Sequence, residues 1–186
     1  WNHTGQTFWA WQDVKERQEQ SQYKDWYWVD SFDNPNTTEN EFNYHGWSGV
    51  YELPEIRETQ KQDLSVRVQP FEGNIYSNAA KQHILNVTKR WLDPNGDGDP
   101  SDGVDGFRLD AVYHIIKDAK FRDNPINPRY IPGHDDPYRQ FLNVYDRGRP
   151  ETLDILNQFC DTVGEYKNKF LVSEVFYKTK ISEIKR

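Results

Sequence analysis

Cysteine, methionine and long apolar runs are scarce or missing in this sequence of 186 residues. It has one cysteine, Cys160, and no methionine. A single cysteine excludes an internal disulfide. No apolar run is long enough to cross a bilayer, so we expect no membrane segment in this piece. Because the chain begins at Trp1 and stops at Arg186 without any methionine, we interpret it as an internal piece of a longer protein.

Basic residues are also fewer than acidic ones, 23 against 30, which gives a formal net charge of -7. This excess argues against nucleic acid and anionic membrane surfaces as partners, whereas a neutral substrate is easily accommodated. Aromatic residues reach 15%, including seven Trp and eleven Tyr. Such rings suit a sugar-binding surface, although for any single Trp the core is the better expectation. The length suffices for one domain with a substantial core.

Three stretches have the period of a helix. The clearest runs from Ser77 to Leu92, and we expect its apolar positions to face the core: Ala80, Ile84, Val87 and Trp91. A second runs from Pro150 to about Val163, and its expected core positions include the cysteine: Leu153, Leu156, Cys160 and Val163. Residues 8–18 predict a short helix. Residues 23–29 predict an extended aromatic segment.

Two short apolar strands flank the second helix. The first carries Arg108 and Asp110 at alternate positions, so both side chains point to one face. Such charges are costly on a buried strand unless they pair or face a site, and a structural ion pair remains an alternative. The second strand, residues 170–176, carries Glu174 near its C-terminal end. Strand, helix and strand predict a right-handed crossover with parallel strands, which brings two carboxylates to the same end.

Residues 106–114 read Gly-Phe-Arg-Leu-Asp-Ala-Val-Tyr-His and resemble the strand-four motif of the α-amylase family, the family 13 glycoside hydrolases. Residues 172–175, Val-Ser-Glu-Val, resemble the strand-five motif of that family. The resemblance implies that Asp110 is the nucleophile and Glu174 the general acid/base of a retaining reaction. Together with Arg108, which faces the same side, these are the predicted catalytic and binding residues of the two strands.

Further binding residues are implied by the same resemblance. Asn2-His3 is similar to the end of the strand-three motif, in which the histidine hydrogen-bonds the sugar at the cleavage point. Tyr113 and His114 follow the nucleophile where the family contacts the leaving-group sugar. His114 is equally suited to be a hydrogen-bonded structural histidine.

The fold expected from the resemblance is α/β, a partial (β/α)8 TIM barrel that runs from the end of strand 3 to strand 5. Residues 1–5 would end strand 3, residues 6–76 would be the inserted domain B, and residues 77–186 would hold helix, strand 4, loop, helix and strand 5. Residues 49–56 are similar to the end of domain B, with Arg57 where the family has Asn. The family's third acid, in an Asn-His-Asp motif, does not occur here. We therefore expect the isolated piece to be inactive and poorly folded.

A loop rich in carboxylates precedes the first strand. Its opening matches a calcium loop in Asp93, Asn95 and Asp97, and Asp99 follows, although Val104 stands where such a loop has its closing acid. The alternative is that Asp, Asn and Gly are turn residues here. We keep Ca²⁺ as a candidate ligand and expect no organic cofactor.

The predicted function is a retaining glycoside hydrolase of carbohydrate metabolism that acts on α-glucosidic bonds of starch-derived glucans or oligosaccharides. Ala111 resembles members that cut α-1,4 bonds, and the loops are similar to those of α-glucosidases and neopullulanase-like members. One alternative is an α-glucan transglycosylase or a trehalose synthase-like isomerase, which use the same residues. Another is a non-catalytic amylase-like module of the transporter heavy-chain type.

Overall fold

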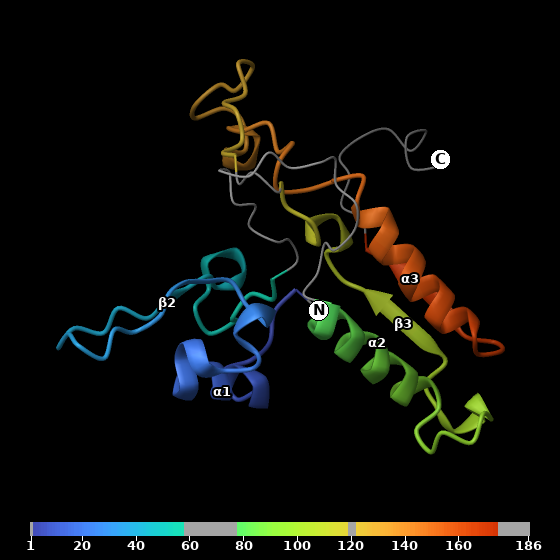
Figure 1. Cartoon of the computed structure of the whole chain (residues 1–186). Helices are drawn as coiled ribbons and strands as arrows, with labels where there is room; N and C mark the ends of the chain where they lie inside the picture. Colours follow the sequence, from blue (N-terminus) through green and yellow to red (C-terminus); the bar gives the residue numbers. More distant parts are fainter. Residues whose placement is uncertain (1, 58–77, 119–121, 175–186) are drawn as a thin grey trace, which may run out of the picture. The chain divides into compact units, whose positions relative to one another are not determined.

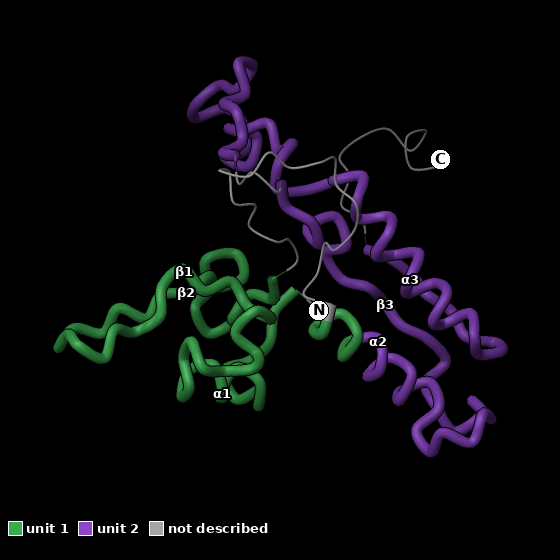
Figure 2. Tube along the Cα trace, viewed as in Figure 1, with its two compact units in different colours: residues 1–84 green, residues 85–186 purple. Residues whose placement is uncertain are grey.

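The computed structural model describes residues 2–57, 78–118 and 122–174 (Figure 1). The chain divides into two compact units, residues 1–84 and 85–186, and the boundary falls inside helix α2 (Figure 2). The first unit holds short elements before that helix: α1 (Trp9–Arg17), η1 (Gln18–Gln20), η2 (Lys24–Trp26), β1 (Val29–Ser31), β2 (Asn43–Tyr44) and η3 (Trp47–Gly49). The helix and the elements after it follow in chain order: α2 (Asn78–Leu92), η4 (Pro100–Asp102), β3 (Gly106–Leu109), η5 (Val112–His114), η6 (Pro137–Arg139), α3 (Thr152–Gly164) and β4 (Phe170–Ser173).

Aromatic rings form the core of the first unit. Trp11 of α1 is completely buried, and its ring centroid lies 4.8 Å from that of Tyr27 and 4.5 Å from that of Tyr44. The indole N–H of Trp11 donates to Gln6 Oε1 at 3.0 Å, so its polar group is satisfied inside the core. Burial raises the pKa of Tyr27 to about 12, against a hydrogen bond with Thr4 that lowers it. Trp11 therefore has the core role expected of a single tryptophan.

The segment 23–29 differs from the extended structure predicted for it. It begins with a 3-10 turn in which the Trp26 N–H donates to the Tyr23 carbonyl at 2.9 Å. The turn folds the Trp26 ring against Trp9 and His83, at centroid distances of 5.7 and 5.4 Å. Only from Tyr27 onward is the backbone extended. Burial of one large ring by its neighbours outweighs the strand preference of the aromatic run.

The second unit confirms the predicted crossover. Strands β3 and β4 pair in parallel, with Gly106 opposite Phe170 and Leu109 opposite Ser173, and α3 connects them along the chain. Gly106 is required by this pairing, because a Cβ there would overlap the carbonyl oxygen of Phe170. Positions 175 and 176, which were predicted to extend the second strand, lie outside the described residues. Within the described helices, none has the length and apolarity needed to cross a membrane.

Of the eight core positions predicted for the two long helices, Ala80 and Val163 are buried as predicted and the other six are not. In α2 the buried residues are Ala80, Leu85, Thr88 and Leu92, whereas Val87 and Trp91 are 40% and 57% exposed. In α3 the buried residues are Thr152, Ile155, Phe159, Thr162 and Val163, whereas Leu153 is exposed, and so is Cys160. Each helix has a second apolar stripe that includes threonine. Thr162 can be buried because its hydroxyl donates to the Gln158 carbonyl at 2.8 Å.

We predict that Gly106→Ala destabilises the protein by about 2 kcal/mol or more, because the new methyl group forces β3 and β4 apart. Gly164→Ala is the matched control, since an added Cβ meets nothing within 4 Å at the end of α3. The control should be neutral or stabilising by about 0.5 kcal/mol. Thermal unfolding of the intact protein measures both, and equal midpoints for the two variants would contradict the role of Gly106.

Candidate active site

Three of the predicted site residues, Arg108, Asp110 and Glu174, come together at the carboxyl ends of β3 and β4. Alternation along β3 buries Leu109 and leaves Arg108 and Asp110 exposed on the other face. Glu174 follows β4, and its backbone N–H donates to the Leu109 carbonyl at 2.9 Å. The parallel register thus continues past both strands and sets Glu174 beside the end of β3. Backbone pairing, rather than a loop, positions both carboxylates.

Arg108 joins the two carboxylates through one guanidinium group. Its Nη1 lies 3.2 Å from Asp110 Oδ1 and its Nη2 lies 2.5 Å from Glu174 Oε2. The structural ion pair considered from the sequence therefore forms, but it is shared with the second carboxylate. The side chains of Arg108 and Asp110 are 56% and 68% exposed, so the pair is open to solvent. Arg108 and Asp110 therefore do not form a buried structural salt bridge.

The Asp110 carboxyl has a lowered pKa. The largest cause is a hydrogen bond with Glu174, desolvation acts in the opposite direction, and the positive charge of Arg108 adds to the lowering. Asp110 is therefore ionised at neutral pH. An ionised carboxylate at this position is suited to act as a nucleophile or as an electrostatic stabiliser.

Ala111, directly after Asp110, adopts the left-handed conformation, with φ 47° and ψ 37°. This region is unfavourable for a residue with a Cβ, and strained residues of this kind gather at functional sites. The turn ends the strand at Asp110 and leads the chain into η5. The sequence carries no signal for it, because glycine or asparagine is the usual residue in this conformation.

Tyr113 and His114 of η5 face the returning end of the long loop that follows β3. The Tyr113 carbonyl accepts from the Gly148 N–H at 2.7 Å, and the ring centroids of Tyr113 and His114 lie 4.3 Å apart. Burial lowers the pKa of His114, the charge of Arg147 lowers it further, and Asp146 opposes the shift. These contacts match the structural alternative for His114 more closely than an open sugar contact.

His3 lies in the other unit, within residues 1–84. It forms an isolated antiparallel bridge with Glu55, and its ring centroid is 6.3 Å from that of Trp47. The Thr4 N–H donates to the Pro54 carbonyl at 3.0 Å. The start of the chain and the segment similar to the end of domain B are thus paired with each other.

The predicted calcium ligands are used in backbone turns. Asp93 is buried and accepts from the N–H groups of Gly96 and Gly98 at 2.8 and 3.0 Å. The other three side chains each accept from the N–H two residues later, at 2.8 to 3.0 Å: Asn95, Asp97 and Asp99. Within the described residues no group of three or more His, Cys, Asp or Glu is placed to hold a metal ion. This geometry is that of the turn alternative.

An ion-pair network around the buried Asp118 was missed from the sequence. Asp118 contacts Arg122 and Arg149, which come from the two ends of the loop between η5 and α3. The only sequence signal is the spacing of four between Asp118 and Arg122, which is common on any polar segment. Arg149 lies too far along the chain for a local pattern to indicate it.

Comparison with known proteins gives a consistent family. The model of the α-amylase catalytic domain matches residues 1–185. A probable α-glucosidase of Rhizobium meliloti (strain 1021) is 29% identical over 170 residues, which cover 87% of this chain and 29% of that protein. Neopullulanase 2 of Thermoactinomyces vulgaris is 27% identical over 115 residues, which cover 61% of this chain and 15% of that protein.

Solved structures agree in fold. The crystal structure of the α-glucosyl transfer enzyme XgtA superposes with a TM-score of 0.65 at 20% identity, over 98% of this chain and 33% of that chain. The debranching enzyme of Nostoc punctiforme gives a TM-score of 0.53 at 19% identity, over 96% of this chain and 25% of that chain. This chain spans a third or less of the length of the proteins it matches. With nearly every residue matched by the family model, the chain belongs to the α-amylase family, whose catalytic domain is a (β/α)8 barrel.

Proposed function

We propose that this chain carries the two reacting carboxylates of a retaining glycoside hydrolase that acts on α-glucosidic bonds. Asp110 is the nucleophile and Glu174 is the general acid/base. The observation that carries the proposal is the placement of both carboxyl groups at the same end of paired parallel strands, with the Arg108 guanidinium in contact with each. Retaining hydrolysis needs a pair of carboxyl groups that flank the scissile bond.

The proposed reaction has two steps. Asp110 attacks the anomeric carbon while Glu174 gives its proton to the glycosidic oxygen, and the leaving sugar departs. Glu174 then takes a proton from a water molecule, which attacks the same carbon and releases Asp110. In the structure the Arg108 guanidinium contacts both carboxyl groups, and retaining enzymes typically hold such a pair about 5 Å apart.

The proposed substrates are starch-derived glucans or oligosaccharides, with α-1,4 bonds favoured by Ala111 after the nucleophile. The names of two relatives, a probable α-glucosidase and a neopullulanase, support α-glucosidic substrates. Transfer of the glycosyl group to a second sugar would use the same carboxylates, with that sugar in place of water. No step in the proposed reaction requires Ca²⁺.

We also propose that the chain is the middle part of a catalytic barrel. Residues 1–5 end strand 3, residues 6–76 form domain B, and residues 77–186 hold the segment from the helix before strand 4 through strand 5. The share of each relative's length that the chain matches, 29% and 33%, supports only part of a barrel. The activity then belongs to the whole protein, and the chain alone is inactive. A non-catalytic module is the weaker alternative, because it has no need for three charged groups at one strand end.

We expect Asp110→Asn to lower kcat of the intact protein on maltooligosaccharides by about 10³-fold or more, since the nucleophile is lost. Glu174→Gln should lower kcat by about 10²- to 10⁴-fold. Steady-state kinetics measure both, and the anomeric form of the first product, followed by NMR, should be α. Asp105→Asn is the matched control, because this exposed aspartate lies just before β3 and far from its carboxyl end. Unchanged turnover in Asp110→Asn would sink the assignment.

A second prediction concerns the pH dependence. Hydrogen bonding from Glu174 and the charge of Arg108 hold the pKa of Asp110 low, so replacing Arg108 removes one of these causes. In Arg108→Gln the pKa of Asp110 rises, and the carboxyl group then ionises only at higher pH. The acid limb of kcat/KM should therefore move to higher pH, which a pH–rate profile measures. A limb that stays in place, or moves to lower pH, would contradict the role of Arg108.

A further inference from the structure

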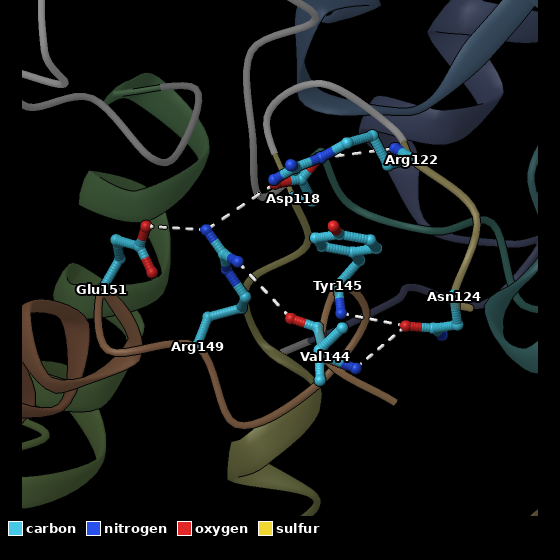
Figure 3. Close-up of polar contacts among 7 residues, drawn as sticks. All are labelled: Asp118, Arg122, Asn124, Val144, Tyr145, Arg149 and Glu151. Carbon is cyan, nitrogen blue, oxygen red and sulfur yellow. Dashed lines mark hydrogen bonds and ion pairs between the residues drawn. The ribbon is translucent and has the colours of Figure 1, made fainter. Parts of the chain in front are cut away.

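The loop between η5 and α3 is held at both ends by one buried carboxylate. The Asp118 side chain is 4% exposed and binds Arg122 in a bidentate manner, with Nε to Oδ2 at 2.9 Å and Nη2 to Oδ1 at 2.7 Å. Nη2 of Arg149, from the other end of the loop, lies 3.7 Å from Asp118 Oδ1 (Figure 3). The two arginines come from positions 27 residues apart and converge on one carboxylate.

Further contacts close the same junction. The Asp118 N–H donates to the Tyr145 carbonyl at 2.6 Å, and the Arg122 guanidinium lies 4.0 Å from the centre of the Tyr145 ring. Arg149 also reaches Glu151 at 3.1 Å, so the two carboxylates and two guanidinium groups balance in charge (Figure 3). The two ends of the loop are therefore tied to each other by a backbone hydrogen bond, a guanidinium–ring contact and an ion pair.

Between these ends, residues 124–145 form a compact segment that we call the loop lobe. Asn124 Oδ1 accepts from the N–H groups of Val144 and Tyr145, at 3.0 and 2.9 Å. The Leu142 N–H donates to the Pro125 carbonyl and the Asn127 N–H to the Gln140 carbonyl, both at 2.8 Å. Residues 124–127 thus pair with residues 140–145 and close the base of the lobe.

The lobe lies beyond the carboxyl end of β3, the end that Asp110 follows. Figure 1 shows residues 122–150 beyond the C-terminal end of β3, past η5. The Gly148 N–H donates to the Tyr113 carbonyl at 2.7 Å, and Tyr113 lies three residues after Asp110. The junction at Asp118 is therefore attached to the short segment that follows the nucleophile, and its geometry sets the direction in which the lobe leaves the strand.

Surface chemistry of the lobe suits a sugar chain. A cavity of about 590 Å³ is lined by hydrogen-bonding side chains that include Asn127, Arg129, His134 and Arg139. Tyr138 and Phe141 expose 74% and 43% of their surface nearby in the sequence. Amide, imidazole and guanidinium groups can bind hydroxyl groups, and aromatic rings can pack on sugar faces.

We infer that Asp118 is a positioning residue that ties both ends of the loop and so holds the loop lobe against the sugar chain beyond the cleaved bond. The role of the lobe in binding sugar rests on the proposed function, whereas the tie between the two ends of the loop does not. Asp118 is suited to this role because hydrogen bonds from Arg122 keep it ionised despite burial. Removing its charge leaves two guanidinium groups without their shared partner, which releases the junction.

The test is Asp118→Asn in the intact protein. We expect kcat on a small aryl α-glucoside to stay within about two-fold, while KM for maltooligosaccharides rises about ten-fold. Amide hydrogen exchange in residues 122–150 should become at least about ten-fold faster, with β3 and α3 unchanged. Asp123→Asn is the matched control, since it removes the same charge from an exposed position of the same loop.

Arg149→Gln provides a second variant from the other end of the loop. If one junction holds the lobe, this variant should repeat the KM and exchange effects, and Asp118→Asn with Arg149→Gln should be no worse than the stronger single variant. Additive effects in the double variant would overturn the common junction.

Two results would overturn the positioning role of Asp118. One is unchanged exchange in residues 122–150 with an unchanged KM. The other is faster exchange throughout β3 and α3 with equal loss of kcat on both substrates, which marks a purely structural residue. Hydrogen exchange needs no turnover, so faster exchange confined to the loop supports the tie even where Asp110→Asn leaves turnover unchanged and the proposed function fails.

Discussion

The parallel pairing of β3 and β4 is the constraint on which the candidate active site depends. Its register puts Leu109 beside Ser173, and the next residue on each strand is a carboxylate. Gly106 permits the close approach of the two backbones at the other end of the pair. A slip of one residue would turn Arg108 and Asp110 to the face now taken by Leu109, and the charges would then be buried. The backbone hydrogen bonds between β3 and β4 therefore determine where the charged side chains of the site lie.

Two arrangements of arginine and carboxylate groups in the second unit differ in their exposure to solvent. Arg108 is exposed and contacts two carboxylates, Asp110 and Glu174, so water competes for these contacts. Asp118 is buried and gathers two arginines, so its contacts are strong and costly to break. The same pair of chemical groups is thus open to solvent at the end of β3 and closed to it eight residues later, at Asp118.

The chemistry of the strands could be predicted from the sequence, but much of the packing could not. Alternation alone places Arg108 and Asp110 together, and the helices begin and end within about two residues of their predicted limits. The buried faces of α2 and α3 could not be chosen, because each helix has two apolar stripes and a satisfied threonine can replace an aliphatic residue in the core. The contacts of Asp118 could not be predicted, because Arg149 is distant from it in the sequence. Burial and long-range partners depend on the whole fold, and local hydrophobic periodicity in the sequence does not predict them.

Strand β4 carries Phe170 and Val172 at alternate positions, and these side chains are 57% and 51% exposed. Within residues 2–57, 78–118 and 122–174, β3 is its only strand partner. A short apolar strand with one edge unpaired among the described residues offers backbone donors and acceptors to an extended segment of another molecule. Strand addition at β4 is therefore the form of self-association that the described part of the chain favours.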